Sequence, residues 1–174
     1  RYATNPICIA LPPRGLEEPV ILDFATSKVA MGKIRVAHHR HESVKEGLLI
    51  DAEGKPTTDP GVMYSDRVGA LLPIAEHKGY GLALMCELLA GAIGGGGTIQ
   101  PGNHRDTRIV NSMLSIVIDP ERLTEPDFIA SEMREMCDYV RQSPPAEDGL
   151  PVLLAGDPER AFGKERMANG IYVE

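Results

Sequence analysis

Apolar residues fall along the chain in two kinds of pattern, one typical of strands and one typical of helices. Short apolar runs bounded by Pro, Gly or Asp predict four core strands, at residues 6–11, 19–24, 113–118 and 151–154. Longer segments with helical spacing predict four helices, at residues 29–37, 78–93, 126–142 and 157–169. Strands interleaved with helices favour a layered α/β domain.

The ends of these elements carry local signals. Thr26-Ser27 offers an N-cap for the first helix, and Gly170 is a C-terminal stop for the last. The helix at 126–142 is amphipathic, as expected when one face packs on a core. Scattered Gly and Pro make residues 44–73 a loop-rich crossing.

Composition places the chain among ordinary globular proteins. It has 174 residues, 43% hydrophobic and 25% charged, so we expect a single domain over residues 1–174. A net charge of -7 and a pI of about 5.3 exclude a broad polyanion-binding face, so no nucleic-acid partner is expected and any anion site is local. No signal peptide is visible, and no apolar run reaches the ~18–20 residues of a membrane span. The start at Arg1, without Met, suggests the interior of a longer protein.

The three cysteines are odd in number and far apart in the sequence, which argues against a disulfide framework. Cys8 and Cys86 lie inside apolar runs. We therefore expect buried thiols in a reducing, cytoplasmic compartment.

The helix at 78–93 begins with His77 and Lys78, although a helix N-terminus already carries partial positive charge. A bound anion would reverse this unfavourable interaction, and Gly79 and Gly81 would let a ligand approach the backbone. The alternative is a solvated Lys78 beside a surface His77, with Glu76 as partner.

Two other motifs favour structural interpretations. Gly94–Gly97 follows a helix, whereas a dinucleotide fingerprint follows a strand and opens a helix, so this run predicts a helix stop and a loop. His38 and His41 have the i, i+3 spacing of metal ligands, but no second pair lies near in sequence and Arg40 adds repulsion. We expect a solvated helix end there and no metal site.

Two strand-to-helix or loop-to-helix junctions are candidate ligand sites. Asp23 follows a predicted strand, where its carboxylate could accept hydrogen bonds from ribose hydroxyls; capping by Ser27 alone is the alternative. At the second junction, Asp157 as N-cap and Pro158 at N1 are sufficient to explain a helix start. A nucleotide contact there needs further support. No nucleophile elbow, phosphate-binding loop or paired zinc motif occurs.

An ordered set of motifs covers nearly the whole chain. In chain order these are Thr4-Asn5-Pro6, Asp23-Phe24-Ala25-Thr26-Ser27, Gly32-Lys33, Ile50-Asp51, the stretch from Gly54 to Pro60, Gly69 to Pro73, His77 to Gly81, and Asp119-Pro120. Together they resemble the type-2 malate/L-lactate dehydrogenase family, which also contains ureidoglycolate and sulfolactate dehydrogenases and Δ1-piperideine-2-carboxylate reductases. Ala75-Glu76-His77-Lys78 and the stretch from Ser143 to Gly156 resemble the hydroxycarboxylate dehydrogenase B branch.

The resemblance implies an NAD(P)-dependent oxidoreductase that interconverts a 2-oxo acid and a 2-hydroxy acid, with NAD or NADP as cofactor. It implies a homodimer that acts on a small molecule. The implied fold is a three-layer α/β/α arrangement around a mixed sheet, a non-Rossmann NAD(P)-binding fold of the L-sulfolactate dehydrogenase-like type.

The resemblance also implies roles for particular positions. Those expected at the cofactor are Thr4, Leu22, Asp23, Ala25, His77, Lys78, Gly156, Asp157 and Glu159. Those expected at the substrate are Met31, Gly32 and Lys33. Lys33 stands where the imine-reducing branch has an aspartate, and a lysine suits an anionic 2-oxo acid better than a cyclic imine. Ala155 departs from the family, which usually has Pro before the glycine.

The family's proton-donor histidine lies upstream of the segment that this chain resembles, so no catalytic residue is expected here. A further cofactor stretch and a C-terminal helical tail are also lacking. We therefore expect the cofactor-binding central and C-terminal part of a longer enzyme, inactive alone. The alternatives are a cyclic-imine (Δ1-piperideine-2-carboxylate) reductase and, if the short chain is natural, a non-catalytic nucleotide-binding or dimerisation module.

Overall fold

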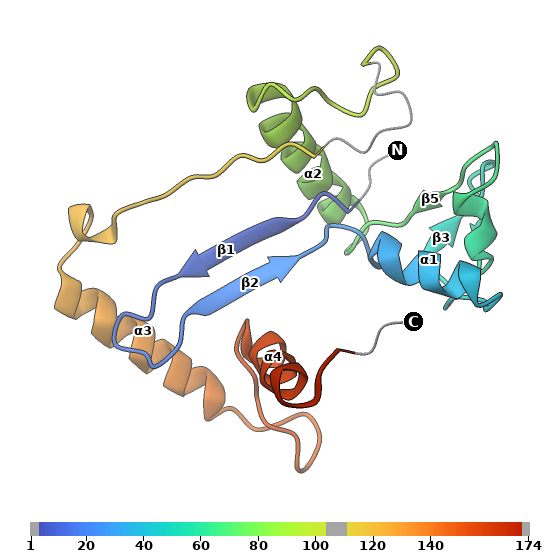
Figure 1. Cartoon of the computed structure of the whole chain (residues 1–174). Coiled ribbons are helices and arrows are strands. Elements are labelled where there is room, and N and C mark those ends of the chain that lie inside the picture. Colours follow the sequence, from blue (N-terminus) through green and yellow to red (C-terminus); the bar gives the residue numbers. More distant parts are fainter. Residues whose placement is uncertain (1–3, 104–110, 172–174) are drawn as a thin grey trace. The chain divides into compact units, whose positions relative to one another are not determined.

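The computed structural model describes residues 4–103 and 111–171, which belong to two compact units (Figure 1). Unit 1 comprises residues 1–7 and 24–116, and unit 2 comprises residues 8–23 and 117–174. Each unit therefore combines segments that are distant in the sequence. The expected single domain over residues 1–174 stays a prediction, because compact units can belong to one domain.

Unit 1 is made of short elements around a small apolar core. They are α1 (Met31–His39), β3 (Leu49–Ile50), β4 (Pro56–Thr57), the 3₁₀ helix η1 (Pro60–Met63), β5 (Ala70–Leu71), α2 (His77–Cys86) and the π-helix η2 (Glu87–Ile93). β3 is the middle strand of an antiparallel sheet, between β4 and β5. The core cluster consists of Ile34, Leu49 and Met63, one each from α1, β3 and η1. Residues 44–73 are loop-rich, as predicted, but they also contain η1 and the three strands of this sheet, which were not predicted.

The predicted start of the first helix is wrong. α1 begins at Met31 after Ala30, and among the described residues no side chain caps it. The Thr26 hydroxyl donates instead to the carbonyl oxygens of Thr4 and Asn5, at 3.0 Å each. The Ser27 hydroxyl donates to the Val29 carbonyl oxygen at 2.8 Å. Both hydroxyls are used to fix the chain path before the helix and are not available as caps.

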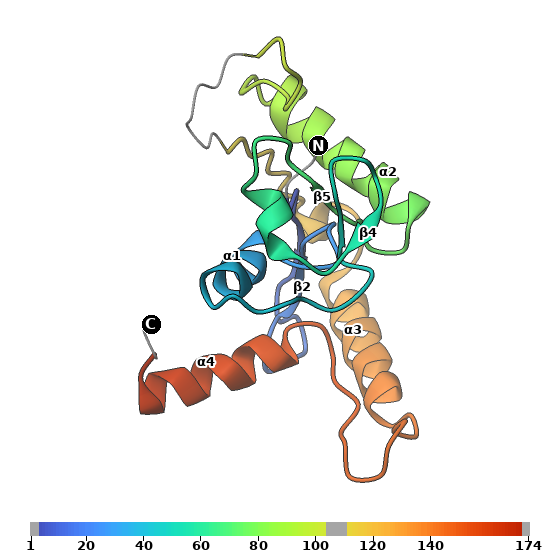
Figure 2. The same cartoon turned by 90° about the vertical axis from the view of Figure 1, so that its right-hand side faces the viewer.

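The predicted helix over residues 78–93 is confirmed, with one change of winding. α2 continues directly into the wider turns of η2 (green, Figure 2). Gly94 is the C-cap, and Gly95 and Gly97 follow with φ of 78° and 81°, conformations that favour glycine. The glycine run is thus a helix stop and loop, as predicted.

Unit 2 contains a two-stranded sheet and two helices. Its elements are β1 (Ile7–Leu11) and β2 (Val20–Phe24), apart from their end residues Ile7 and Phe24, which belong to unit 1, together with the 3₁₀ helix η3 (Pro120–Arg122), α3 (Pro126–Arg141) and α4 (Asp157–Asn169). β1 and β2 are hydrogen-bonded neighbours that run in opposite directions (Figure 1). Both helices agree with prediction, and Gly170 (φ 81°) ends α4 as expected.

Two predicted strands are wrong. Residues 113–118 are assigned to no strand, and Met113, Ile116 and Val117 are 82%, 76% and 95% exposed, so this is not a core strand. Residues 151–154 also lack strand pairing. In both segments the apolar pattern is right for a strand, but a strand also needs a hydrogen-bonding neighbour, and the described ranges provide none.

The cysteines differ in exposure. All three are free thiols, but Cys8 is exposed, Cys86 is half-buried and only Cys137 is buried, so the expectation of buried thiols is wrong for Cys8. Burial raises the pKa of the Cys86 thiol. Within the described residues, no helix has the length and apolar character needed to cross a membrane.

Candidate functional site

A hollow of about 290 Å³ lies in unit 2, between β2 and the start of α4. It is lined by Ile21, Leu22, Asp23, Leu153, Leu154, Ala155, Gly156, Pro158 and Glu159. Four of these positions, Leu22, Asp23, Gly156 and Glu159, were assigned to a cofactor by resemblance, from two segments far apart in the sequence. The fold brings them to one place.

The turn before α4 is joined to β2 by backbone contacts. The Ile21 N–H donates to the Ala155 carbonyl oxygen at 3.2 Å. Gly156 has φ of 94°, and a Cβ there would lie 2.8 Å from Arg160 Nη1 and 3.3 Å from the Ile21 carbonyl oxygen. Only glycine meets both the conformation and the close approach.

Asp157 is the first residue of α4, and the prediction that it is the N-cap is wrong. The N-cap is Gly156, and the Asp157 carboxylate turns back to accept the Leu154 N–H at 2.9 Å. The same carboxylate bonds to Arg160, and Arg141 Nη2 lies 3.8 Å away. The Leu154 hydrogen bond and the two arginines hold the pKa of Asp157 below its usual range, against the opposing effect of partial burial.

The other two carboxylates of the hollow are differently placed. Asp23 and Glu159 are exposed, and within residues 4–103 and 111–171 neither has a hydrogen bond or an ion pair. Ionised carboxylates accept hydrogen bonds only. The hollow therefore offers two acceptors beside the apolar side chains of Leu22 and Leu153, which suits a ligand that has both hydroxyl groups and an apolar surface.

In unit 1, the expected cofactor pair His77-Lys78 opens α2. Both side chains are exposed, and no side chain caps this helix within the described residues. Ala75 and Glu76, just before it, have φ of 43° and 52°, in the left-handed region that non-glycine residues rarely adopt. No ion pair joins Glu76 to Lys78 in the described part of the chain. Glu76 is therefore not the partner of Lys78 that the alternative interpretation expected.

The two glycines of this helix start differ from each other. A Cβ at Gly79 would collide with the backbone carbonyl of Ile74, so this glycine serves a close backbone contact and not the approach of a ligand. A Cβ at Gly81 would meet nothing within 4 Å. Of the two, only Gly81 retains the expected open surface.

The remaining expected cofactor residues of unit 1, Thr4 and Ala25, are brought together by Thr26. Thr26 is 1% exposed, and both its N–H (2.9 Å) and its hydroxyl bond to the Thr4 carbonyl oxygen. The Thr26 carbonyl oxygen accepts the Ile74 N–H at 2.9 Å. These bonds hold the chain next to Ala25 against the residues that lead into α2.

The expected substrate residues form the first turn of α1. Met31 packs against the core cluster of unit 1, so its side chain has a structural role. Gly32 and Lys33 are exposed, and a Cβ at Gly32 would meet nothing within 4 Å. Lys33 is thus a solvent-facing cation at an open surface.

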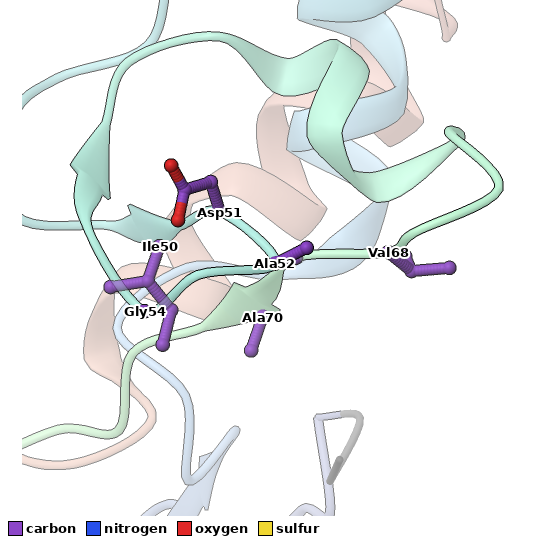
Figure 3. A pocket seen from close by; sticks show the side chains of 7 residues that line it. Ile50, Asp51, Ala52, Gly54, Val68 and Ala70 are labelled. Atoms are coloured by element: carbon purple, nitrogen blue, oxygen red, sulfur yellow. The ribbon is translucent and has the colours of Figure 1, made fainter.

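A second hollow, of about 490 Å³, lies in unit 1 at the turn between β3 and β4 and the residues leading into β5 (Figure 3). None of the expected site residues lines it. Its acid, Asp51, already accepts the N–H groups of Glu53 (2.9 Å) and Lys55 (2.8 Å). The Asp51 carboxylate is thus engaged in stabilising the turn beside this hollow.

The histidine cluster lies at the end of α1, with His38 and His39 in the last turn, where cations are favourable. The His38 ring stacks on Tyr64, with ring centroids 4.4 Å apart. In the part of the chain that the structure describes, no group of three or more His, Cys, Asp or Glu side chains is placed to hold a metal.

Arg160 and Arg141 were not singled out in the sequence. Arg160 stands at i+3 from Asp157, a spacing that brings side chains together on a helix, so this pair was visible in principle. Arg160 also donates to the Pro19 carbonyl oxygen at 2.8 Å. This bond joins residues 141 positions apart, so no local sequence pattern predicts it.

Comparisons with known proteins agree with the resemblance. Hydroxycarboxylate dehydrogenase B of Escherichia coli (strain K12) is 43% identical over 180 residues, covering 100% of this chain and 48% of that protein. The Δ1-pyrroline-2-carboxylate/Δ1-piperideine-2-carboxylate reductase of Pseudomonas putida is 35% identical over 144 residues, covering 80% of this chain and 41% of its own. The chain thus spans about half the length of its first curated relatives.

The fold is also shared with solved structures. The sulfolactate dehydrogenase of Methanocaldococcus jannaschii matches with a TM-score of 0.68 and 30% identity, covering 97% of this chain and 48% of that one. The expected α/β fold of the sulfolactate dehydrogenase-like type is therefore confirmed. The sequence profile of malate/L-lactate dehydrogenases matches residues 1–174 from end to end, and the chain belongs to this family.

Proposed function

We propose that the full-length protein is an NAD(P)-dependent oxidoreductase that interconverts a 2-oxo acid and a 2-hydroxy acid, and that this chain supplies most of its cofactor site. The observation that carries the proposal is the hollow of unit 2, where Leu22 and Asp23 meet Gly156 and Glu159. The same family resemblance assigns both of these distant segments to a cofactor, and the family match spans both.

The residues of the hollow fit part of a dinucleotide. The carboxylates of Asp23 and Glu159, which have no hydrogen bond or ion pair among the described residues, are acceptors for sugar hydroxyls. Leu22 and Leu153 provide an apolar wall for a planar base. In unit 1, His77 and Lys78 offer positive charge at a helix start, which suits a phosphate. Thr4 and Ala25, also in unit 1, are further proposed cofactor contacts.

When bound, the cofactor supplies the hydride, and the protein supplies binding, orientation and the proton. The carboxylates of unit 2 would fix the sugar, while Lys33, at the start of α1, would attract the carboxylate of a 2-oxo acid. Met31 and Gly32 would then shape the surface beside it. The proton donor is proposed to lie outside this chain, and the enzyme is proposed to be a cytoplasmic homodimer.

Turnover by the full-length protein tests this proposal. NADH and NADPH oxidation is followed with pyruvate-type 2-oxo acids and, in parallel, with Δ1-piperideine-2-carboxylate. We expect turnover with a 2-oxo acid, because Lys33 replaces the acid expected for imine reduction. Turnover with the cyclic imine alone would favour the reductase, and dinucleotide binding without turnover of either would favour a non-catalytic module.

A further inference from the structure

The carboxylate of Asp157 lies beside the proposed cofactor hollow but is occupied by other parts of the chain. It accepts the Leu154 N–H, bonds to Arg160 and lies near Arg141. Only 20% of its side chain is exposed, and the hollow is lined by its neighbours Gly156 and Pro158 instead. A carboxylate already bonded in this way has little capacity left for a ligand.

Arg160 is engaged at both ends of its guanidinium group. Nη1 donates to the Pro19 carbonyl oxygen at 2.8 Å, and Nη2 bonds to Asp157. Its side chain is 22% exposed. An arginine near the N-terminus of a helix would ordinarily be a candidate for binding phosphate. Arg160 instead donates to the carbonyl oxygen of Pro19, the residue just before β2.

These contacts form one continuous connection. It runs from Pro19, just before β2, through Arg160 and Asp157 to the Leu154 N–H in the turn before α4. The direct bond from the Ile21 N–H to the Ala155 carbonyl oxygen runs parallel to it. Both walls of the hollow are therefore held by the same pair of side chains.

We propose that Asp157 and Arg160 are positioning residues: together they clamp the turn of residues 153–156 to β2, and so place Gly156, Asp23 and Glu159 for the cofactor. This inference rests on the proposed function for the nature of the ligand, and it replaces the cofactor contact expected of Asp157 by an indirect role. Direct acceptance from sugar hydroxyls then falls to Asp23 and Glu159.

A double-mutant cycle in the full-length protein tests the clamp. Asp157→Ala, Arg160→Met and the double variant are titrated with NADH and NADPH, and the dissociation constants are compared. Because each single change breaks the same connection, we expect each to weaken binding by about tenfold and the double variant to be no weaker than about tenfold. Multiplying effects, about a hundredfold in the double variant, would show that Asp157 and Arg160 act independently and would overturn the proposal.

Amide hydrogen exchange in the ligand-free protein provides a second readout. Loss of the Asp157 acceptor should speed exchange of the Leu154 N–H by about tenfold, and Asp157→Asn, which keeps an acceptor oxygen, should restore much of the protection. Unchanged exchange at Leu154 in Asp157→Ala would overturn the clamp. If Asp157→Ala does not fold, Arg160→Met alone is compared with the wild type: weaker dinucleotide binding supports the clamp, and unchanged binding overturns it.

Glu165→Gln is the matched control, because it removes one negative charge from the exposed surface of the same helix. Its dissociation constant and its exchange at Leu154 should equal those of the wild type. If the wild-type protein binds neither dinucleotide, the proposed function fails, whereas the exchange measurement still decides whether the clamp exists.

Discussion

The starts of α2 and α4, which carry most of the expected cofactor residues, have opposite charge. α2 opens with His77 and Lys78 and has no acid in its first turn, whereas the first turn of α4 contains Asp157 and Glu159. Acids stabilise a helix N-terminus, so α4 compensates its own dipole and α2 does not. An α2 start of this kind gains from a bound anion, and an α4 start gains from groups that donate hydrogen bonds.

The two starts also differ in how the backbone reaches the helix. At α4 the left-handed residue is Gly156, which adopts φ of 94° at little cost. At α2 the left-handed residues are Ala75 and Glu76, which store strain of about 1–3 kcal/mol each. The start of α2 thus combines backbone strain with an unfavourable charge. Both features lower stability, and such features are expected where a residue serves ligand binding.

Gly79→Ala has the largest expected effect on this comparison. Its Cβ would collide with the Ile74 backbone carbonyl, which cannot move without displacing the entry to α2. We expect a loss of about 3 kcal/mol or more in the free energy of unfolding, measured by denaturant titration. The matched change Gly81→Ala, on the same helix with open space around it, should stabilise by about 0.5–1 kcal/mol. Equal effects of the two changes would contradict the distinction between these glycines.

Gly156→Ala probes the start of α4 in the same way. The positive φ and the contact with Arg160 Nη1 should together cost about 1–3 kcal/mol of folding stability. Gly163→Ala, in the middle of α4 with nothing within 4 Å of its Cβ, should be neutral or stabilising. Thermal unfolding of both variants measures the difference, and a destabilised Gly163→Ala would show that helix α4 is constrained elsewhere.

Lys78→Ala should have opposite effects on the free and the bound protein. Without a ligand, removing the cation relieves the helix dipole and raises stability by about 0.3–1 kcal/mol. Dinucleotide binding should weaken by about fivefold, with a smaller dependence on salt. Denaturant titration checks the stability and calorimetric titration checks the binding, with Lys45→Ala, an exposed loop lysine of the same unit, as control. An unchanged dissociation constant would remove Lys78 from the cofactor site.

The dependence of folding stability on acid pH tests the contribution of the Asp157 carboxylate to the clamp in unit 2. Its effect should be the smallest of the four predicted for variants. Asp157 has a lowered pKa in the folded protein, chiefly through the Leu154 N–H and helped by Arg160 and Arg141. Its contribution is therefore complete above the pKa of the unfolded chain and is lost as the pH falls through the lower folded value. Asp157→Asn should flatten stability curves recorded between neutral and strongly acidic pH. A variant curve parallel to that of the wild type would mean that the carboxylate contributes nothing.

Helices could be predicted from the sequence because their signals are local. The spacing within residues 126–142 and the stops at Gly94 and Gly170 all act within a few residues. The prediction that Thr26 caps the first helix is wrong because the Thr26 hydroxyl bonds to Thr4 and Asn5, which are more than a helical turn away in sequence. The strand at residues 113–118 was wrong because pairing depends on a neighbour that an apolar pattern does not specify.

The candidate site shows the same division. The individual positions, from Asp23 to Glu159, came from motifs, but that two distant segments line one hollow came only from the fold. The sequence likewise did not predict the ion pairs of Asp157 with Arg160 and Arg141 or its hydrogen bond with the Leu154 N–H. Only the i, i+3 spacing of Asp157 and Arg160 was a signal. Sequence thus named the residues, and the structure separated those that line the hollow, such as Asp23 and Glu159, from Asp157, whose carboxylate is bonded within the chain.

Direct titration of the full-length protein with NADH and NADPH tests the central claim most simply. Binding to a cofactor site predicts saturation with one dinucleotide per chain and a dissociation constant in roughly the 1 μM to 1 mM range usual for enzyme ligands. The affinity should fall when Glu159, which lines the hollow of unit 2, is neutralised. A well-folded protein that binds neither dinucleotide at millimolar concentration would contradict the account.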